Sequence, residues 1–357
     1  MLRYPPVEYH DISTNFASDF FALVDKSEHI VLSGHEFADD DSVSSILALF
    51  SLLIKRYPQK DIRMICLGDK DSRYSIFRYY DKIEYCEEIA DHLKHVDLLV
   101  VVDGGNYSRF SHKPEILKTI PHTICIDHHA SKIDSFTLSL VISKSPACSQ
   151  IVFQTFFPDQ KIDQELAKTF LLGILGDTGN LSYINPEQVE TFSIVKKLVD
   201  ISQVNILEFQ SSYRHISRKI FSAIKEYIKN TKLVNQESKW PPFQYSFVSR
   251  NFVTKHRYTD NEISEACFLY VYHYLRTISG YPWGFVITPR LSGDATISCR
   301  SLLNSVNVKK FLEEMGVGGG HDQAAGGKFV HQDKSLDSSD CLKYIFSWMQ
   351  NHNPSQT

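Results

Sequence analysis

His122-Thr-Ile-Cys-Ile-Asp-His-His129 is the stretch that decides the fold of this chain, because an apolar run ends there in one carboxylate and two imidazoles. Three other apolar runs end in the same way. They are His29–Ser33 before His35, Asp39 and Asp41, Leu98–Val102 before Asp103, and Phe170–Leu175 before Asp177-Thr-Gly179. Short apolar runs of this kind are typical of buried strands or helix segments. Four such clusters indicate one site that is assembled from distant parts of the sequence.

Short apolar runs alternate with longer helical patterns through the first half of the chain. This alternation predicts an α/β fold with a doubly wound, mostly parallel sheet. Ligands bind such sheets at the carboxyl ends of the strands, so the polar clusters are expected along one edge. Asp177 differs slightly, because it follows a run with a helical pattern. We expect strands near 29–33, 62–67, 97–102, 122–126 and 139–142, and helices over 14–26, 41–56, 111–118, 145–157 and 161–176.

Break signals in Val234–Phe243, which contains two adjacent prolines, indicate a boundary before a second, smaller unit. We expect a first domain at residues 1–190, a helical linker at 191–240, and an α+β domain at 241–357. The second domain is predicted to contain strands near 243–249, 282–288 and 294–299, helices near 262–277 and 307–315, and a glycine loop at Gly318–His321. The alternating aromatics Phe268, Tyr270, Tyr272 and Tyr274 are expected to pack in the core and against a partner rather than to stack on bases.

The composition is that of an ordinary globular protein, with 43% hydrophobic and 22% charged residues in 357. A formal net charge of -4 argues against long nucleic acid as the main ligand, since such proteins usually carry a basic face. Seven scattered cysteines without a CxxC pair indicate reduced thiols and predict a cytoplasmic protein. The sequence has neither a signal-peptide pattern nor an apolar run long enough to cross a membrane, so no membrane association is expected.

Carboxylates and imidazoles gathered at strand ends are the ligands of a divalent metal site, and four clusters suggest two metals. Each cluster alone has a plain structural explanation. Asp40 is expected to be a solvated turn or N-cap residue, Asp103-Gly-Gly105 could be a turn, and His35 a packed core histidine. The conjunction of all four clusters favours the metal site.

The order of these motifs resembles the DHH phosphoesterase superfamily. Gly318-Gly319-Gly320-His321, followed by Ala324–Gly327, resembles its DHHA1 substrate-binding domain, so the resemblance covers roughly residues 30 to 330. The sequence departs from the family pattern at two positions, with Ala38 where proline is usual and Leu181 where phenylalanine is common. Neither position supplies a metal ligand in the family pattern.

The resemblance implies a site with two Mn2+ ions, with Mg2+ or Co2+ as alternatives. Asp103 would bridge the two metals, Asp127 would orient the neighbouring groups, and His129 would face the substrate as a phosphate contact or proton donor. The implied ligands are His35, Asp39 and Asp103 for one metal and Asp41, Asp103, His128 and Asp177 for the other. The implied substrate contacts in the second domain are Arg300, Ser301, Gly318, Gly319, Gly320 and His321.

The expected activity is hydrolysis of short phosphorylated nucleotides, namely cyclic di-AMP, pApA, nanoRNA or pAp, by two-metal-activated attack of water on phosphorus. A pyrophosphatase or exopolyphosphatase is an alternative, although those relatives carry a different second domain. A catalytically weak nucleotide-binding regulator is a second alternative, which intact ligands at all six metal positions disfavour. A general single-strand-binding module is disfavoured by the charge. The resemblance also allows a homodimer.

Overall fold

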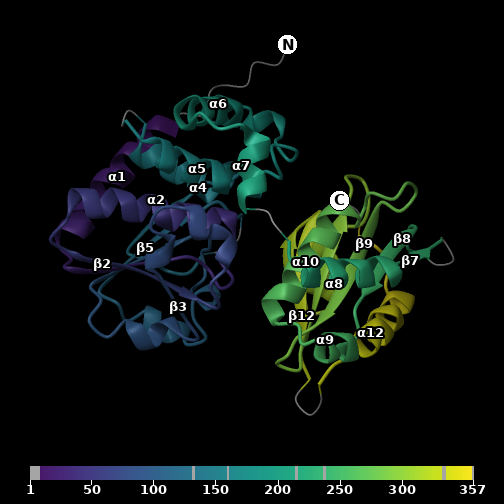
Figure 1. The fold of residues 1–357 in the computed structure, drawn as a ribbon. Coiled ribbons are helices and arrows are strands. Elements are labelled where there is room, and N and C mark those ends of the chain that lie inside the picture. Colours follow the sequence, from purple (N-terminus) through teal and green to yellow (C-terminus); the bar gives the residue numbers. More distant parts are fainter. Residues whose placement is uncertain are drawn as a thin grey trace. The chain divides into compact units, whose positions relative to one another are not determined.

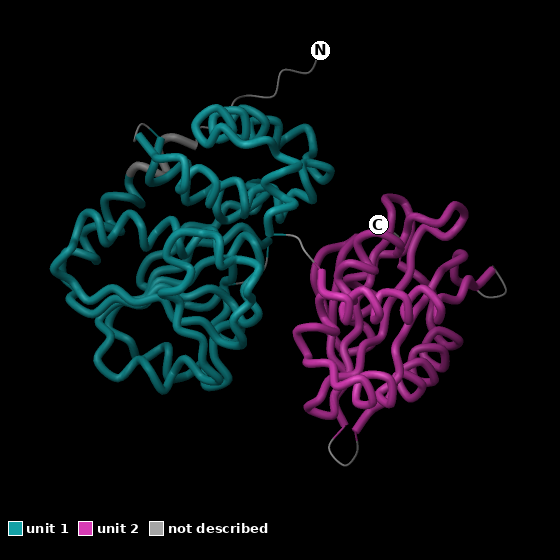
Figure 2. The backbone as a smooth tube through the Cα atoms, in the orientation of Figure 1, with its two compact units in different colours: residues 1–215 teal, residues 216–357 magenta. Residues whose placement is uncertain are grey.

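The computed structural model describes residues 9–130, 133–158, 161–213, 216–235, 239–331 and 335–355. The chain divides into two compact units, residues 1–215 and 216–357 (Figure 2). The division lies inside the segment for which the sequence predicts a helical linker. The helices before it belong to the first unit, and the helix after it belongs to the second.

A six-stranded, fully parallel sheet forms the centre of the first unit (Figure 1). Its order is β3-β2-β1-β4-β5-β6, so the chain builds outward from β1 in one direction and then returns to add β4 on the other side. The predicted α/β fold with a parallel sheet is therefore confirmed, with β3 as an additional edge strand. The strands are β1 (His29–Ser33), β2 (Asp61–Leu67), β3 (Ile83–Cys86), β4 (Leu98–Val102), β5 (His122–Asp127) and β6 (Leu138–Val141).

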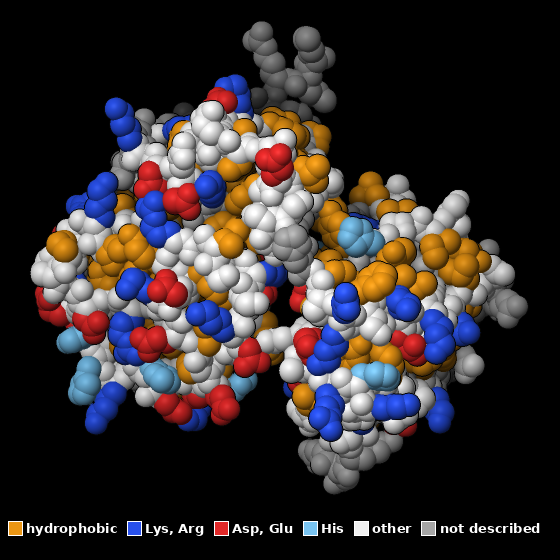
Figure 3. Space-filling view, in the orientation of Figure 1, with side chains coloured by type: hydrophobic (Ala, Val, Ile, Leu, Met, Phe, Trp, Pro, Cys, Tyr) orange, Lys and Arg blue, Asp and Glu red, His pale blue; other side chains and the backbone are white. Residues whose placement is uncertain are grey.

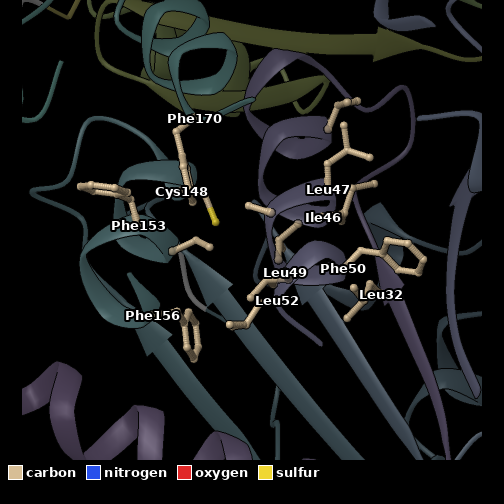
Figure 4. Close-up of a cluster of buried hydrophobic side chains, with 14 of the residues drawn as sticks. Leu32, Ile46, Leu47, Leu49, Phe50, Leu52, Cys148, Phe153, Phe156 and Phe170 are labelled. Atoms are coloured by element: carbon tan, nitrogen blue, oxygen red, sulfur yellow. The ribbon is translucent and has the colours of Figure 1, made fainter. Parts of the chain in front are cut away.

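The two faces of this sheet are covered differently. Long helices cover one face, where Leu32 of β1 belongs to the same buried cluster as helix residues such as Phe153 and Phe170 (Figure 4). On the other face, Val31 and Leu99 pack against short helices and turns. The helices are α1 (Tyr9–Asp25), α2 (Asp40–Arg56), α3 (Pro114–Leu117), α4 (Cys148–Phe156), α5 (Gln164–Asp177), α6 (Glu190–Ser202) and α7 (Ile206–Tyr213). The described residues of this unit also form short 3-10 helices, η1 (Ser72–Ile76), η2 (Tyr80–Lys82), η3 (Ile89–His92), η4 (Tyr107–Arg109) and η5 (Pro186–Gln188).

The second unit is an α+β unit with a mixed six-stranded sheet of order β11-β12-β10-β9-β8-β7. Only β8 and β9 run parallel among the paired strands of this sheet. A cluster around Trp240, Trp283 and Phe311 packs on one face, and a second around Tyr227 and Tyr270 packs on the other. Its strands are β7 (Lys232–Val234), β8 (Phe243–Phe247), β9 (Trp283–Pro289), β10 (Ala295–Ser301), β11 (Gly318–His321) and β12 (Ala324–Phe329). Its helices are α8 (Arg218–Lys229), α9 (Arg250–Lys255), α10 (Asp260–His273), α11 (Val308–Glu314) and α12 (Ser338–Asn351).

The sequence predicts a glycine loop at Gly318–His321. This prediction is wrong, because these residues form the edge strand β11, which pairs with β12. The glycines let the two strands approach closely. A Cβ atom on Gly318 would lie 2.2 Å from the carbonyl oxygen of Gly326, and one on Gly327 would lie 2.4 Å from that of Val317. No larger residue fits either position without a shift of the backbone.

The aromatic residues of α10 only partly follow the core prediction. Tyr270 is buried as expected, but Phe268 is 58% exposed, and its ring stacks with that of Tyr272. Phe268 therefore lies on the surface of the helix rather than in the core. Across the described helices, none combines the length and the apolar character that a membrane crossing requires.

Candidate metal centre

The strand order brings the polar clusters of the first unit together. The chain reverses its direction of sheet growth between β1 and β4, and such a switch point forms a crevice at the carboxyl ends of the two strands. His35 follows β1, and Asp103 follows β4 directly. Asp127 ends the next strand, β5, and Asp177 ends α5. Groups that lie more than a hundred residues apart in sequence therefore meet at one edge.

The N-termini of α2 and α4 hold the carboxylates of Asp39 and Asp41. Asp39 is the N-cap of α2, and its Oδ1 accepts hydrogen bonds from the N–H groups of Asp41 and Ser42, both at 3.1 Å. The side chain of Asp41 reaches the start of α4, where it accepts from the N–H of Cys148 at 2.6 Å and from that of Ser149 at 2.9 Å. Helix N-termini stabilise carboxylates in this way, so both side chains are fixed by backbone that is already ordered.

Asp103 lies between two imidazoles. Its Oδ2 is 3.3 Å from Nε2 of His35, and its Oδ1 is 3.4 Å from Nε2 of His128. Asp103 is buried and has a φ of 60°, a left-handed conformation that aspartate tolerates better than most residues. One carboxylate thus contacts the histidine of two different motifs, one with each oxygen.

The candidate ligand atoms form overlapping groups, in each of which all atoms lie within 4.8 Å of one another. Nε2 of His128 is 3.1 Å from Oδ2 of Asp177 and 4.0 Å from Oδ2 of Asp41. The first unit therefore brings together all six side chains that the family resemblance implies as metal ligands. The groups are His35, Asp39 and Asp103; Asp41, His128 and Asp177; and Asp103, His128 and His129.

The orientation of the two imidazoles fits a divalent cation. Nδ1 of His35 is 2.7 Å from the carbonyl oxygen of Glu36, and Nδ1 of His128 is 3.3 Å from that of Ser145. Only a nitrogen that carries a proton can donate to a carbonyl, so in a neutral ring the lone pair lies on Nε2. Both Nε2 atoms face carboxylate oxygens, which are also lone-pair donors. A cation between them satisfies both sets of lone pairs, and neutral imidazoles with carboxylates suit Mn2+.

The electrostatics of the cluster also require positive charge. Burial alone would lower the pKa of His35, but hydrogen bonds and charge from Asp103 and Asp39 outweigh it and raise the pKa to about 10. Burial, together with the charges of Asp103 and Asp177, raises the pKa of Asp41 well above its usual range. Without metal, protons take the place of the missing cations at this site.

Asp127 organises His129. It is fully buried at the end of β5, and its Oδ1 accepts from the N–H of His128 at 2.8 Å and lies 2.7 Å from Nδ1 of His129. This contact fixes the ring of His129 so that Nε2 faces away from Asp127. The other carboxylate oxygen, Oδ2, is buried without a hydrogen-bond partner among the described residues.

The expected substrate contacts of the second unit do not form a single group. Arg300 lines a cavity of about 280 Å³ beside β12. Ser301 is the next residue in β10, and strand alternation turns it to the opposite face, where it is fully buried. Gly318, Gly319, Gly320 and His321 lie in β11, outside the lining of this cavity. The cavity is also lined by Phe268, Thr288, Arg290, Ser298, Gly326 and Gly327.

Sequence reasoning missed several residues around these sites. Arg290 and Phe268 line the cavity of the second unit, and a lone arginine after a strand or an aromatic within a helix gives no signal for that role. Asp40 was expected to be solvated, which is wrong, since it is buried and accepts a hydrogen bond from Tyr74. In the sequence, the only sign that Asp40 differs from a solvated residue is its place in the run of three aspartates, Asp39-Asp40-Asp41.

Comparison with known proteins places these features in context. Residues 29–174 match the model of the DHH family, N-terminal domain. The chain is 24% identical over 179 residues to a probable bifunctional oligoribonuclease and PAP phosphatase NrnA of Streptococcus mutans, covering 50% of this chain and 54% of that protein. It is 21% identical over 320 residues to the cyclic-di-AMP phosphodiesterase GdpP of Geobacillus thermodenitrificans, covering 84% of this chain and 44% of that protein.

The chain spans 36% to 54% of the length of the curated relatives that it matches. Among solved structures, it resembles an exopolyphosphatase-related protein from Bacteroides fragilis with a TM-score of 0.76 at 19% sequence identity. That match covers 94% of this chain and 96% of the other. At this level of identity the likeness extends to the fold.

Proposed function

We propose that this chain, which belongs to the DHH family, is a metal-dependent phosphoesterase acting on short phosphorylated nucleotides or cyclic dinucleotides. The observation that carries the proposal is the position of Asp103, one oxygen of which lies beside His35 and the other beside His128. A carboxylate in this position suits a pair of divalent cations that share it as a ligand.

His35, Asp39 and Asp103 would hold one cation, and Asp41, Asp103, His128 and Asp177 would hold the other. When bound, such cations neutralise charge on a phosphoryl group and activate water at neutral pH. The residues themselves supply positioning. The helix N-termini of α2 and α4 fix Asp39 and Asp41, so the ligands are pre-oriented before any substrate binds.

His129 would contact the phosphate or deliver a proton to the leaving oxygen through Nε2. Its Nδ1 lies 2.7 Å from Oδ1 of Asp127, and this contact holds the ring in one orientation. Asp127 is fully buried, and His129 is its ionic partner in the described part of the chain.

Several features of the chain favour a short ligand. The cavity of the second unit is lined by two arginines, Arg290 and Arg300, which suit phosphate oxygens, and by the exposed ring of Phe268, which suits a base. Acidic and basic side chains are interspersed on the face of the first unit that Figure 3 shows. The names of the two relatives refer to oligoribonuclease, PAP phosphatase and cyclic-di-AMP phosphodiesterase activities.

The proposal is tested by chromatographic product analysis with Mn2+. Cyclic di-AMP, pApA, pAp, a 5′-phosphorylated pentanucleotide and pyrophosphate are offered side by side. Preferential conversion of cyclic di-AMP or pApA would indicate a second-messenger phosphodiesterase, and faster loss of pAp and the pentanucleotide would indicate degradation of RNA ends. Fastest turnover of pyrophosphate, or dinucleotide binding without any product, would reject the proposal. Asp103→Asn serves as the inactive control.

A further inference from the structure

A further carboxylate, that of Asp40, lies between Asp39 and Asp41 at the start of α2. Asp40 is 8% exposed, and it belongs to none of the candidate metal groups found among the described residues. Its Oδ1 accepts a hydrogen bond of 2.6 Å from the hydroxyl of Tyr74 and lies 3.4 Å from Nη2 of Arg73. A buried carboxylate needs such partners, because an uncompensated charge is costly away from water.

The contacts around Asp40 form a chain of directed hydrogen bonds. Nη2 of Arg73 donates to the hydroxyl oxygen of Tyr74 at 2.6 Å, and that hydroxyl donates onward to Asp40. Nε of Arg73 donates to Asp71 at 2.6 Å, which fixes the guanidinium. Tyr74 is fully buried, so its hydroxyl is not exposed to bulk water. Arg73 and Tyr74 both belong to η1, which follows β2 and contains no candidate metal ligand.

Asp40 also touches the end of α5. A Cβ atom on Gly176 would lie 2.4 Å from Cβ of Asp40 and 2.9 Å from its Oδ2, so only glycine fits there without a shift. Gly176 immediately precedes Asp177. Asp40 therefore contacts the backbone that carries Asp177, while its own backbone carries Asp39 and Asp41 on either side.

We propose that Arg73 and Tyr74 are positioning residues of the metal centre and act on it through Asp40. This inference rests on the proposed metal-dependent function. The hydroxyl of Tyr74 holds the carboxylate of Asp40 between η1 and α5, and this contact sets the first turn of α2 relative to the end of α5. Arg73 balances the charge of Asp40, so a third acidic residue in this turn neither repels the metal ligands nor competes with them for the cation.

The test is Mn2+ binding to EDTA-treated protein, measured by titration calorimetry on Tyr74→Phe and on a matched control, Tyr107→Phe. Tyr107 is a buried tyrosine of the same unit. Its hydroxyl donates to Oγ1 of Thr123 at 3.0 Å and to the carbonyl oxygen of Ser135 at 3.2 Å, outside the chain of hydrogen bonds around Asp40. Removing a group that supports metal ligands typically weakens metal affinity about 10- to 100-fold. We expect a Kd about tenfold higher for Tyr74→Phe and within about twofold of wild type for Tyr107→Phe.

Thermal unfolding in EDTA separates positioning from general stability. Both variants lose a buried hydroxyl and are expected to unfold at a lower temperature, but only Tyr74→Phe is expected to change the Kd. In an Asp40→Ala background, Tyr74→Phe is expected to cause no further loss of affinity. If Tyr74→Phe does not fold, Arg73→Gln is measured in the same way, with the same expected direction.

Equal Kd values for wild type and Tyr74→Phe would overturn the inference, as would equal losses in the two tyrosine variants. Additive losses in the Asp40→Ala background would also overturn it, because Tyr74 would then act by another route. If the wild-type protein itself binds no Mn2+, the proposed metal centre is rejected instead. The two failures are thus distinguishable in one set of titrations.

Discussion

Binding of Mn2+ to the metal-free protein should release protons. In the absence of metal, Nε2 of His35 lies 3.3 Å from Asp103 and 3.7 Å from Asp39, and these carboxylates raise the pKa of His35 to about 10. The ring therefore carries a proton at the nitrogen that faces the site. A metal ion needs the lone pair of that nitrogen, so it can bind only as the proton leaves.

The magnitude follows from the pKa. At a pH of ~7.5, about 2.5 units below the pKa, well over ~99% of His35 is protonated, so nearly one proton leaves for each cation bound beside it. The pKa of His128 is also raised, against the effect of burial, by hydrogen bonds with Asp103 and Asp177. A second cation should therefore displace about one more proton. Each displaced proton makes the apparent affinity rise about tenfold per pH unit below the pKa.

The assay is titration calorimetry of EDTA-stripped protein with Mn2+ at one pH, in buffers with different ionisation enthalpies. The slope of heat against buffer enthalpy gives the number of protons released. We expect about one proton per cation in wild type, and about one fewer in total for His35→Gln, which keeps a polar side chain without a titrating group. Heats that do not depend on the buffer would refute the reasoning, because the imidazoles would then already be neutral.

Four further outcomes follow from the same geometry. In EDTA, unfolding free energy should fall between pH ~6.5 and ~10, by up to about 1.4 kcal/mol per pH unit. The reason is that folded His35 keeps its proton until about pH 10, whereas the unfolded ring loses it near ~6.5. Denaturant titrations at several pH values should show that the unfolding free energy of His35→Gln depends less on pH in that range. Asp103→Asn keeps a side chain that tolerates the left-handed backbone, so the variant should fold in EDTA. It should nevertheless lose at least ~100-fold in Mn2+-dependent turnover. Normal turnover would argue against Asp103 as a ligand shared by two cations. Phe170→Ala removes a fully buried ring packed on Phe153 and should lower the unfolding free energy by about 3–5 kcal/mol, whereas a loss below ~1 kcal/mol would contradict the packing. Arg300→Met should raise KM about 10-fold with little change in kcat, as measured by steady-state kinetics. An unchanged KM with a lower kcat would show that Arg300 does not bind the substrate.

The fold of the first unit is largely readable from the sequence, for a physical reason. Strands of a parallel sheet are buried on both faces, so they appear as continuous apolar runs, as in Leu98–Val102, all of which is buried. The polar residue after each run then marks a strand end. Because all strands of the sheet are parallel, these ends share one edge, and Asp103 and Asp127 are brought to the same place by topology alone.

Other features depend on packing between distant segments and leave no local pattern. Asp40 has the sequence context of a solvated helix start, but Tyr74 and Gly176 come from elsewhere in the chain and bury it. Gly318–His321 has the composition of a turn, and only its partner β12 makes it a strand, since both strands need glycine to approach so closely. In both cases the deciding contact is made by residues from elsewhere in the sequence. The local residue types instead indicate a solvated Asp40 and a turn at Gly318–His321.

The metal centre also connects function to stability. Asp41 is buried and Asp177 is half-buried, and the pKa of each is raised by loss of water and by neighbouring charge, so folding without metal gathers like charges that repel one another. The helix starts of α2 and α4 offset part of this cost through the hydrogen bonds to Asp39 and Asp41. Protons offset a further part in the metal-free protein, and bound cations would take their place. A cation that binds only the folded chain adds about 2.7 kcal/mol of stability at a concentration of ~100 times its Kd. The same ligands that would carry the chemistry should therefore make Mn2+ a stabilising ligand for the first unit.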